Sequence, residues 1–207
     1  YAGGSGGFMD KYCSPFARGR VFNTIEKDEG QYDVPCQIFW ASGTAFITRR
    51  NIFEKLMGFD ETMFAHMEEI DYHWKCQMLG YEIWVEPQSV VYHHNAITLP
   101  ATSAHKTYLN YRNSLILLLS NYPPIVSLQL IFPRIIMEFL SLIKEVIFFR
   151  WNHALAIFRS WIWILFHLGY VCRRRRKFGK IQQLNNIYKK SIVVKYFLMQ
   201  KKTYREL

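Results

Sequence analysis

Residues Phe39 to His94 read FWASGTAFITRRNIFEKLMGFDETMFAHMEEIDYHWKCQMLGYEIWVEPQSVVYHH, and the other segments of the chain are best interpreted around them. An apolar run with a small-residue centre, Gln37 to Thr48, opens this region and predicts a strand. A glycine inside a strand often marks the close approach of a ligand or of another backbone. Tight packing against a neighbouring strand explains Gly43 equally well.

Two helices are expected next. Arg49 to Leu56 has helical character, and Gly58 follows it as a C-terminal glycine does. The second helix carries one apolar stripe at helical spacing, made of Met63, Met67, Ile70, Trp74 and Met78. Acids cluster near its start, and acids there stabilise the helix dipole by about 0.3–1 kcal/mol each. A catalytic role for them therefore requires a second feature.

That second feature is a histidine pair. Tyr81–Val85 and Ser89–His93 are predicted strands separated by Pro87, and His93 ends the second strand. A histidine at a strand end is well placed to bind a metal or to carry a proton. A partly buried polar side chain is the commoner explanation of a lone histidine.

The N-terminal region is rich in glycine. It starts at Tyr1 without a signal-peptide pattern, so we expect a fragment of a longer protein, with an expression linker at Gly3–Gly7 as the alternative. Arg18 and Arg20 flank Gly19, and two guanidinium groups on one turn suit an anion such as a phosphate. A solvated loop with two arginines is an equally good interpretation.

Composition narrows the possible partners. The chain has 207 residues, a formal net charge of +10 and four cysteines without a CxxC pair. The spacing argues against a zinc knuckle or a disulfide framework and suits a reducing compartment. The positive surplus lies after Lys106, which predicts a polyanionic partner. No nucleic-acid-binding motif is present, so an anionic membrane surface is preferred over nucleic acid.

The C-terminal third is apolar and basic. Ile125–Phe149 contains charges and Pro133, and predicts a pair of amphipathic helices. Leu155–Val171 is rich in aromatic residues and precedes the basic run Arg173–Lys177, a combination typical of peripheral attachment to an anionic bilayer. A single transmembrane helix is the alternative, although charged residues are costly in lipid. Phe178–Leu207 is expected to be helical, or disordered when isolated.

The pieces WASGTAFITRRNIF, MGFDETMFAHMEEIDYHWKCQMLGYEI and EPQSVVYHH, in this order and spacing, resemble the C-terminal half of family 2 glycosyltransferases, in the rhamnosyltransferase-like branch. The resemblance covers residues 1–121. It implies an α/β fold: the C-terminal half of a Rossmann-like GT-A catalytic domain without its nucleotide-binding half. Residues 122–207 are then expected to form a membrane-associating region of amphipathic helices.

The resemblance also implies roles for single residues. Glu69 aligns with the base that deprotonates the acceptor, where the family usually has Asp, while Glu68 and Asp71 align with the other acids of that motif. His93 aligns with the family's metal-binding histidine. The strand residues Trp40, Ser42 and Gly43 align with the lining of the sugar and acceptor pocket. In the helix predicted at His105–Leu119, Arg112 and Asn113 align with a segment that closes behind the active site, which implies contact with the acceptor or the diphosphate; a packing helix is the other interpretation.

The implied reaction transfers a sugar, with inversion, from a nucleotide-sugar donor to a glycan or lipid-linked acceptor in bacterial surface polysaccharide synthesis. Carboxylates and one imidazole can hold Mg or Mn against the leaving diphosphate, and a carboxylate can take the acceptor proton. The family's DxD metal motif is absent from this chain, so the chain alone is expected to be inactive. The expected location is the cytoplasmic face of the inner membrane. A non-catalytic membrane-surface or scaffold protein is the alternative function.

Overall fold

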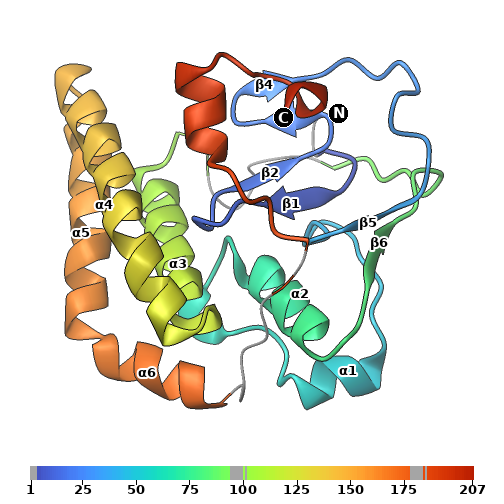
Figure 1. The fold of residues 1–207 in the computed structure, drawn as a ribbon, viewed down its shortest axis with the longest axis horizontal. Helices are drawn as coiled ribbons and strands as arrows, with labels where there is room; N and C mark the ends of the chain where they lie inside the picture. The colour runs from blue at the N-terminus through green and yellow to red at the C-terminus, as the bar shows by residue number, and fades with distance from the viewer. Residues whose placement is uncertain (1–3, 94–99, 101, 178–183, 185) are drawn as a thin grey trace. The chain divides into compact units, whose positions relative to one another are not determined.

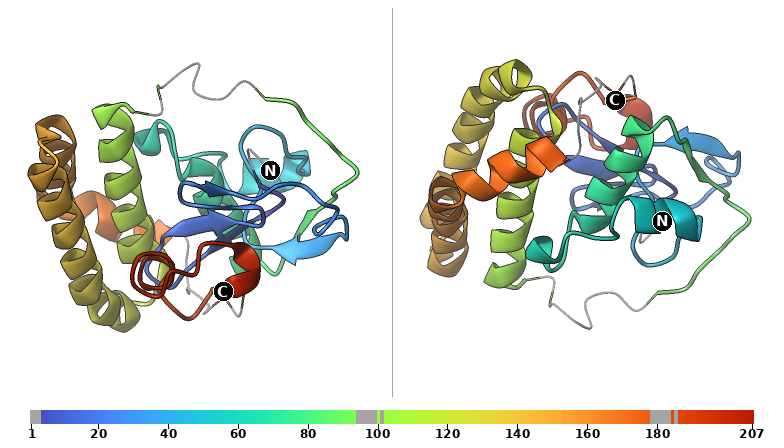
Figure 2. Two further views of the ribbon diagram at one scale, coloured as in Figure 1. Left: turned by 90° about the horizontal axis from the view of Figure 1, so that it is seen from above. Right: turned by 90° about the horizontal axis from the view of Figure 1, so that it is seen from below.

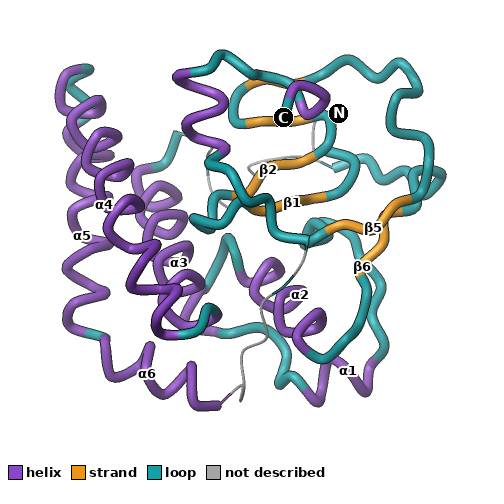
Figure 3. The backbone as a smooth tube through the Cα atoms, viewed as in Figure 1, coloured by secondary structure: helices purple, strands orange, loops and turns teal. Residues whose placement is uncertain are grey.

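The computed structural model describes residues 4–93, 100, 102–177, 184 and 186–207, which form a mixed α/β structure (Figures 1 and 3). The chain divides into two compact units. The mixed unit comprises Tyr1–Phe59, Glu69–His93 and Leu184–Leu207, and the helical unit comprises Asp60–Glu68 and His94–Gln183. The sequence predicted parts at 1–121 and 122–207, whereas residues 60–68 and 94–121 group with the helical unit and Leu184–Leu207 groups with the mixed unit.

Short antiparallel strands form the sheets of the mixed unit. Four strands pair in chain order: β1 (Gly7–Met9), β2 (Pro15–Ala17), β3 (Arg20–Val21) and β4 (Thr24–Ile25). A separate pair joins β5 (Cys36–Ile38) to β6 (Ile83–Val85), with Gln37 opposite Trp84. Because the named strands in the described residues pair antiparallel, the GT-A arrangement stays a prediction.

Two predicted strands are corrected by the structure. The strand expected over Gln37–Thr48 ends at Ile38, because the backbone bends at Phe39 and the Trp40 carbonyl then accepts a hydrogen bond from the Gly7 amide at 3.0 Å. Ser89–His93 does not form a strand. The Ser89 amide donates to the Glu86 carbonyl at 3.1 Å, which makes a turn around Pro87. His93 is thus an exposed residue in irregular backbone rather than the end of a strand.

The predicted helices of this region are present. They are α1 (Arg50–Lys55) and α2 (Glu68–Met78), and their packed apolar cluster contains Ile52, Leu56, Tyr72 and Cys76. Gly58 has a φ of +67°, the left-handed conformation that favours glycine after a helix. The stripe expected on the second helix is buried from Met63 to Trp74. Its first residue, however, lies in a short 3-10 helix, η1 (Glu61–Met63), and α2 itself begins at Glu68.

The last segment completes the mixed unit, where the sequence predicted a membrane-associated or disordered tail. Ile192 is fully buried with Phe16 and Val21, and its amide donates to the Asp10 carboxylate at 2.9 Å. Tyr188 forms a parallel bridge with Asp10. The segment also contains a short π-helix, η2 (Val194–Leu198), and a 3-10 turn, η3 (Tyr204–Glu206). In Figure 1 this segment (red) lies beside the β1–β2 strands.

Among the described residues, the helical unit contains η1 and the α-helices α3 (Ala104–Asn121), α4 (Pro124–Ile147), α5 (Trp151–Phe166) and α6 (Leu168–Lys177). α3 packs against the other three (Figure 2). The helix pair expected over Ile125–Phe149 is one continuous helix that accommodates Pro133. The helix expected over Leu155–Val171 instead breaks at His167, and α6 bends away from α5 by 64°.

Candidate active site

The backbone just before α2 is strained. Phe64, His66 and Met67 have φ values of 61°, 66° and 74°, although none of them is glycine. A non-glycine residue in the left-handed region costs of order 1–3 kcal/mol, and such residues cluster at functional sites. The strain lies directly before Glu68, the first residue of α2. The acidic segment predicted to be catalytic is therefore preceded by a loop with an imposed conformation.

Neighbouring side chains from α3 impose that conformation. The Asn113 amide is buried and donates to the carbonyls of Met63, Ala65 and His66 at 2.9, 3.0 and 2.7 Å. The Arg112 guanidinium donates to the Thr62 and Met63 carbonyls at 2.7 and 3.1 Å. Asn113 and Arg112 thus hold backbone carbonyls of the loop. Their predicted contact with an acceptor or diphosphate stays a prediction.

The start of the loop is held from α6. The Asp60 carboxylate accepts a hydrogen bond from the Tyr170 hydroxyl at 2.7 Å and a second from the buried Arg174 guanidinium. Its other oxygen accepts from the Thr62 amide at 3.0 Å and so caps η1. Arg174, a residue of the basic run predicted to bind the membrane surface, therefore forms an ion pair inside the helical unit.

Two titratable groups at this loop have perturbed pKa values. Burial raises the pKa of the Glu68 carboxyl, and its Oε2 has no hydrogen-bond partner among the described residues. Burial lowers the pKa of His66, and the nearby positive charges of Lys106 and His105 lower it further. A carboxyl with a raised pKa and a neutral imidazole are the forms that general acid–base chemistry uses near neutral pH.

Glu69 lies beside one of the predicted pocket residues. A Cβ placed on Gly43 would lie 3.9 Å from the Glu69 Cβ, so the structure brings these two residues together. Gly43 is exposed, and Ser42 beside it bonds Thr44 through their hydroxyls at 3.1 Å. The Trp40 indole donates to the Phe8 carbonyl at 2.8 Å and therefore supports the sheet.

The remaining predicted acid, Asp71, forms a buried ion pair. Its Oδ2 lies 2.5 Å from the Lys75 Nζ, one turn further along α2, and both side chains are almost completely buried. A buried ion pair of this kind accounts for both charges structurally. A catalytic role for Asp71 stays a prediction.

The two N-terminal arginines lie in different environments. Arg18 is buried, its Nε donates to the Ser5 carbonyl at 2.7 Å, and its guanidinium stacks 5.3 Å from the Tyr32 ring. Arg20 is exposed on β3. Arg18 is therefore part of the sheet's support, and joint binding of one anion by the two arginines stays a prediction.

The resemblance implied a metal ligand at His93. Over the part of the chain that the structure describes, no group of three or more His, Cys, Asp or Glu side chains is arranged to hold an ion. Binding of Mg or Mn by His93 stays a prediction. His94 lies outside the described residues.

Sequence reasoning missed two histidines. His66 lies two residues before Glu68, and nothing in its neighbours' side chains signals the strained backbone. His73 lies one turn after Glu69 in α2, in contact with the rings of Phe46 and Tyr72. Burial lowers its pKa to about 4, opposed by a backbone hydrogen bond with Glu69. His73 follows Glu69 by four residues, and this spacing in a predicted helix could have indicated that the two residues lie one turn apart on the same face.

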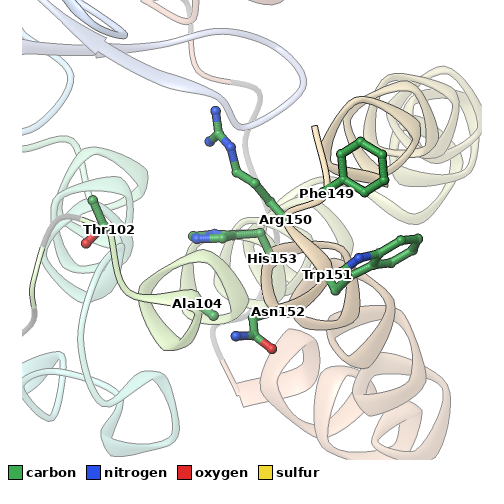
Figure 4. Close-up of a pocket in the computed structure, with 7 residues that line it drawn as sticks. All are labelled: Thr102, Ala104, Phe149, Arg150, Trp151, Asn152 and His153. Atoms are coloured by element: carbon green, nitrogen blue, oxygen red, sulfur yellow. The ribbon is translucent and has the colours of Figure 1, made fainter. Parts of the chain in front are cut away.

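A separate pocket of about 350 Å³ lies in the helical unit at the turn between α4 and α5 (Figure 4). Its lining consists of Thr102, Ala104, Phe149, Arg150, Trp151, Asn152 and His153. The His153 ring is held by the Thr107 hydroxyl at 2.8 Å. None of the residues predicted from the sequence lines this pocket, so it is distinct from the acidic segment.

Comparison with known proteins supports a distant relationship. No protein-family model matches the chain, and no solved structure matches it significantly. Two curated proteins match, each an N-acetylglucosaminyl-diphospho-decaprenol L-rhamnosyltransferase of Mycobacterium tuberculosis, from strains CDC 1551 / Oshkosh and ATCC 25618 / H37Rv. Each is 29% identical over 90 residues, which cover 44% of this chain and 29% of the relative. The similarity supports a glycosyltransferase-like relationship.

Proposed function

We propose that this chain contributes the acceptor side of a glycosyltransferase that moves a sugar from a nucleotide-sugar donor to a glycan or lipid-linked acceptor. The similarity to the two rhamnosyltransferases carries this proposal, because their name describes transfer of L-rhamnose to a diphospho-decaprenol-linked sugar. The acidic start of α2 behind a strained loop supports it independently. Assembly of a bacterial surface polysaccharide is the corresponding biological role.

In the proposed reaction Glu69 is the general base. Its carboxylate takes the proton of the acceptor hydroxyl while that oxygen forms a bond to the anomeric carbon of the donor sugar. The bond from the anomeric carbon to the diphosphate oxygen breaks, and the nucleoside diphosphate leaves with the electron pair. Attack opposite the leaving group inverts the anomeric centre. The exposed Gly43 beside Glu69 leaves room for a hydroxyl-bearing ligand.

Residues of the helical unit hold the loop that precedes Glu68 in the chain. Asn113 and Arg112 bind carbonyls of this loop, and Asp60 fixes its start. Burial raises the pKa of Glu68, the acid that comes before Glu69 in the chain. If His93 holds Mg or Mn, as the resemblance implies, the ion would offset the charge that develops on the leaving diphosphate.

The test uses the complete encoded protein that contains this chain. Nucleotide-sugars are screened, in Mg or Mn buffer, against an N-acetylglucosaminyl-diphospho-polyprenol and soluble glycans. Glu69→Gln should lower turnover by roughly 10²–10⁴-fold, the usual contribution of general-base catalysis, while donor binding persists. Glu54→Gln makes the same charge change on exposed α1 and should leave turnover unchanged.

Three results would count against the proposal. Turnover retained by Glu69→Gln would remove this residue as the base. An equal loss in Glu54→Gln would show that the effect comes from net charge. Absence of transfer with every donor and acceptor, from a protein that is folded by circular dichroism, would favour the scaffold function instead.

A further inference from the structure

The burial pattern of α4 is inverted relative to a helix of a water-soluble protein. The side chains that it buries are Ser127, Arg134, Glu138 and Glu145. Its exposed side chains are mostly large and apolar, including Leu128, Phe132 and Leu140 with exposed fractions of 68%, 73% and 60%. Gln129 and Lys144 are exposed polar residues of the same helix. The buried polar set and the exposed apolar set each recur at helical spacing, so each occupies one face. α4 thus directs its polar face inward and its apolar face outward.

Arg134 and Glu138, at the centre of the buried polar face, are hydrogen-bonded inside the helical unit. The Arg134 guanidinium lies 2.6 Å from the Glu138 carboxylate and 2.7 Å from the Ser114 hydroxyl on α3. The Glu138 carboxylate also accepts from the Trp161 indole of α5 at 2.5 Å. Tyr111 and Ser141 join α3 to α4 through their hydroxyls. Polar groups that bond one another between helices are the expected arrangement where the surroundings are apolar.

The exposed apolar surface continues onto the neighbouring helix. α5 leaves Leu155, Phe158, Leu165 and Phe166 exposed, and Phe149 at the turn before α5 is 79% exposed. An apolar surface of this extent marks an interaction site in a protein. The exposed apolar side chains of Pro124–Ile147 and Trp151–Phe166 together form the α4–α5 apolar face.

Length and charge indicate what covers this face. α4 has 24 residues, which make a helix about 36 Å long at 1.5 Å per residue. That length matches a hydrocarbon layer of about 30 Å. An 18-residue stretch of it is apolar enough to cross a membrane, with a mean hydropathy of 1.7, and only 17% of that stretch is buried inside the protein. Exposed arginines mark both ends, with Arg150 at the α4–α5 turn and Arg173 and Arg176 on α6. Anionic headgroups complement these charges.

We propose that the α4–α5 apolar face is embedded in the hydrocarbon of a lipid bilayer. This differs from the peripheral, mainly electrostatic attachment expected from the basic run, because Arg174 is engaged by Asp60, and Arg175 donates to the Leu119 carbonyl and the Ser127 hydroxyl. Burial of apolar side chains in hydrocarbon is not weakened by salt. Attraction to anionic lipid is weakened at high salt, because salt shortens the Debye length. The inference does not depend on the proposed reaction.

The test is flotation of the full chain with vesicles of zwitterionic phosphatidylcholine in 1 M NaCl. The unmodified chain should float with the vesicles, and Phe139→Glu combined with Leu140→Glu should lower its partition coefficient by about 10-fold or more, because two apolar contacts are replaced by charges. The matched control is Ile47→Glu combined with Trp84→Glu, two exposed apolar residues of the mixed unit, which should float like the unmodified chain.

Several outcomes would overturn the proposal. They are binding that needs anionic lipid and disappears in 1 M NaCl, unchanged flotation of the Phe139/Leu140 variant, and loss of flotation in the control pair. A lipid-free dimer broken by that variant, without vesicle binding, would assign the face to a second copy. If circular dichroism shows that this variant does not fold, Ile125→Glu with Leu128→Glu replaces it, with the same expected loss.

Discussion

The interior of the mixed unit around Ile192 and the inward face of α4 differ in what they bury. In the mixed unit, Ile192, Phe16 and Val21 form an apolar interior around the antiparallel strands. In the helical unit, α4 turns Arg134 and Glu138 inward and its phenylalanines and leucines outward. Since the hydrophobic effect moves apolar area away from water, the same principle applied to both units indicates two different surroundings.

The largest expected effect tests the interior of the mixed unit. Ile192→Asp places a charge in a fully buried site beside Phe16 and should destabilise this unit by about 5 kcal/mol or more, comparable with a domain's whole stability. Near-ultraviolet circular dichroism and limited proteolysis should show loss of the mixed unit while α3–α5 stay helical. Val194→Asp, at a partly exposed position, is the control.

If Ile192→Asp and Val194→Asp behave alike, the last segment does not complete an apolar interior. The contrast between the two units would then rest on the helical unit alone.

The second effect tests the inward polar face of α4. Arg134→Met leaves the Glu138 carboxylate buried without its guanidinium and should cost about 3–5 kcal/mol in unfolding free energy. Arg134→Met with Glu138→Leu removes both charges and should recover much of that loss. Thermal unfolding in detergent micelles measures the difference. A double variant no more stable than the single one would show that the ion pair is not coupled.

The third effect tests the pH dependence of the mixed unit's stability, through the buried imidazole of His73. The pKa of folded His73 is about 4 and that of an ordinary histidine is 6.5, so the unfolded state binds more protons below pH 6.5. Stability should therefore fall as the pH drops from 6.5 towards 4, by about 3 kcal/mol in total. His73→Phe should remove this part of the pH dependence, measured by urea unfolding at several pH values.

An unchanged pH dependence in His73→Phe would contradict burial of a neutral imidazole in α2. A His73 side chain that titrates near 6.5 by NMR would contradict that burial as well.

Local patterns predicted the helices well. α1, α2 and α3 follow from apolar spacing and from Gly58, which are properties of neighbouring residues. The strand ends were predicted less well, because apolar composition continues from Gln37 to Thr48, whereas the pairing with β6 ends at Ile38 and is followed by an isolated bridge between Trp40 and Gly7. Turn formation after Pro87 likewise overrode the strand composition of Ser89–His93.

Long-range contacts were beyond reach from a single sequence. Ile192 is one of several apolar residues in a segment that also contains many lysines, so its burial is not evident from the sequence. Its backbone amide bonds the carboxylate of Asp10, which is 182 residues away in the chain. The left-handed residues Phe64, His66 and Met67 are not glycines, so nothing local signals them. The acids were placed correctly at the start of α2, but the side chains that hold the loop before it come from α3 and α6.

The return of Leu184–Leu207 to the first strands has a consequence for biogenesis. A ribosome adds roughly 5–20 residues per second, and Ile192 follows the end of α5 by 26 residues, so α4 and α5 leave the exit tunnel about 1–5 s before Ile192 does. During that interval the mixed unit lacks part of its apolar interior, while the apolar helices are already outside the tunnel. The helices therefore contact their surroundings before Ile192 can pack against Phe16 and Val21.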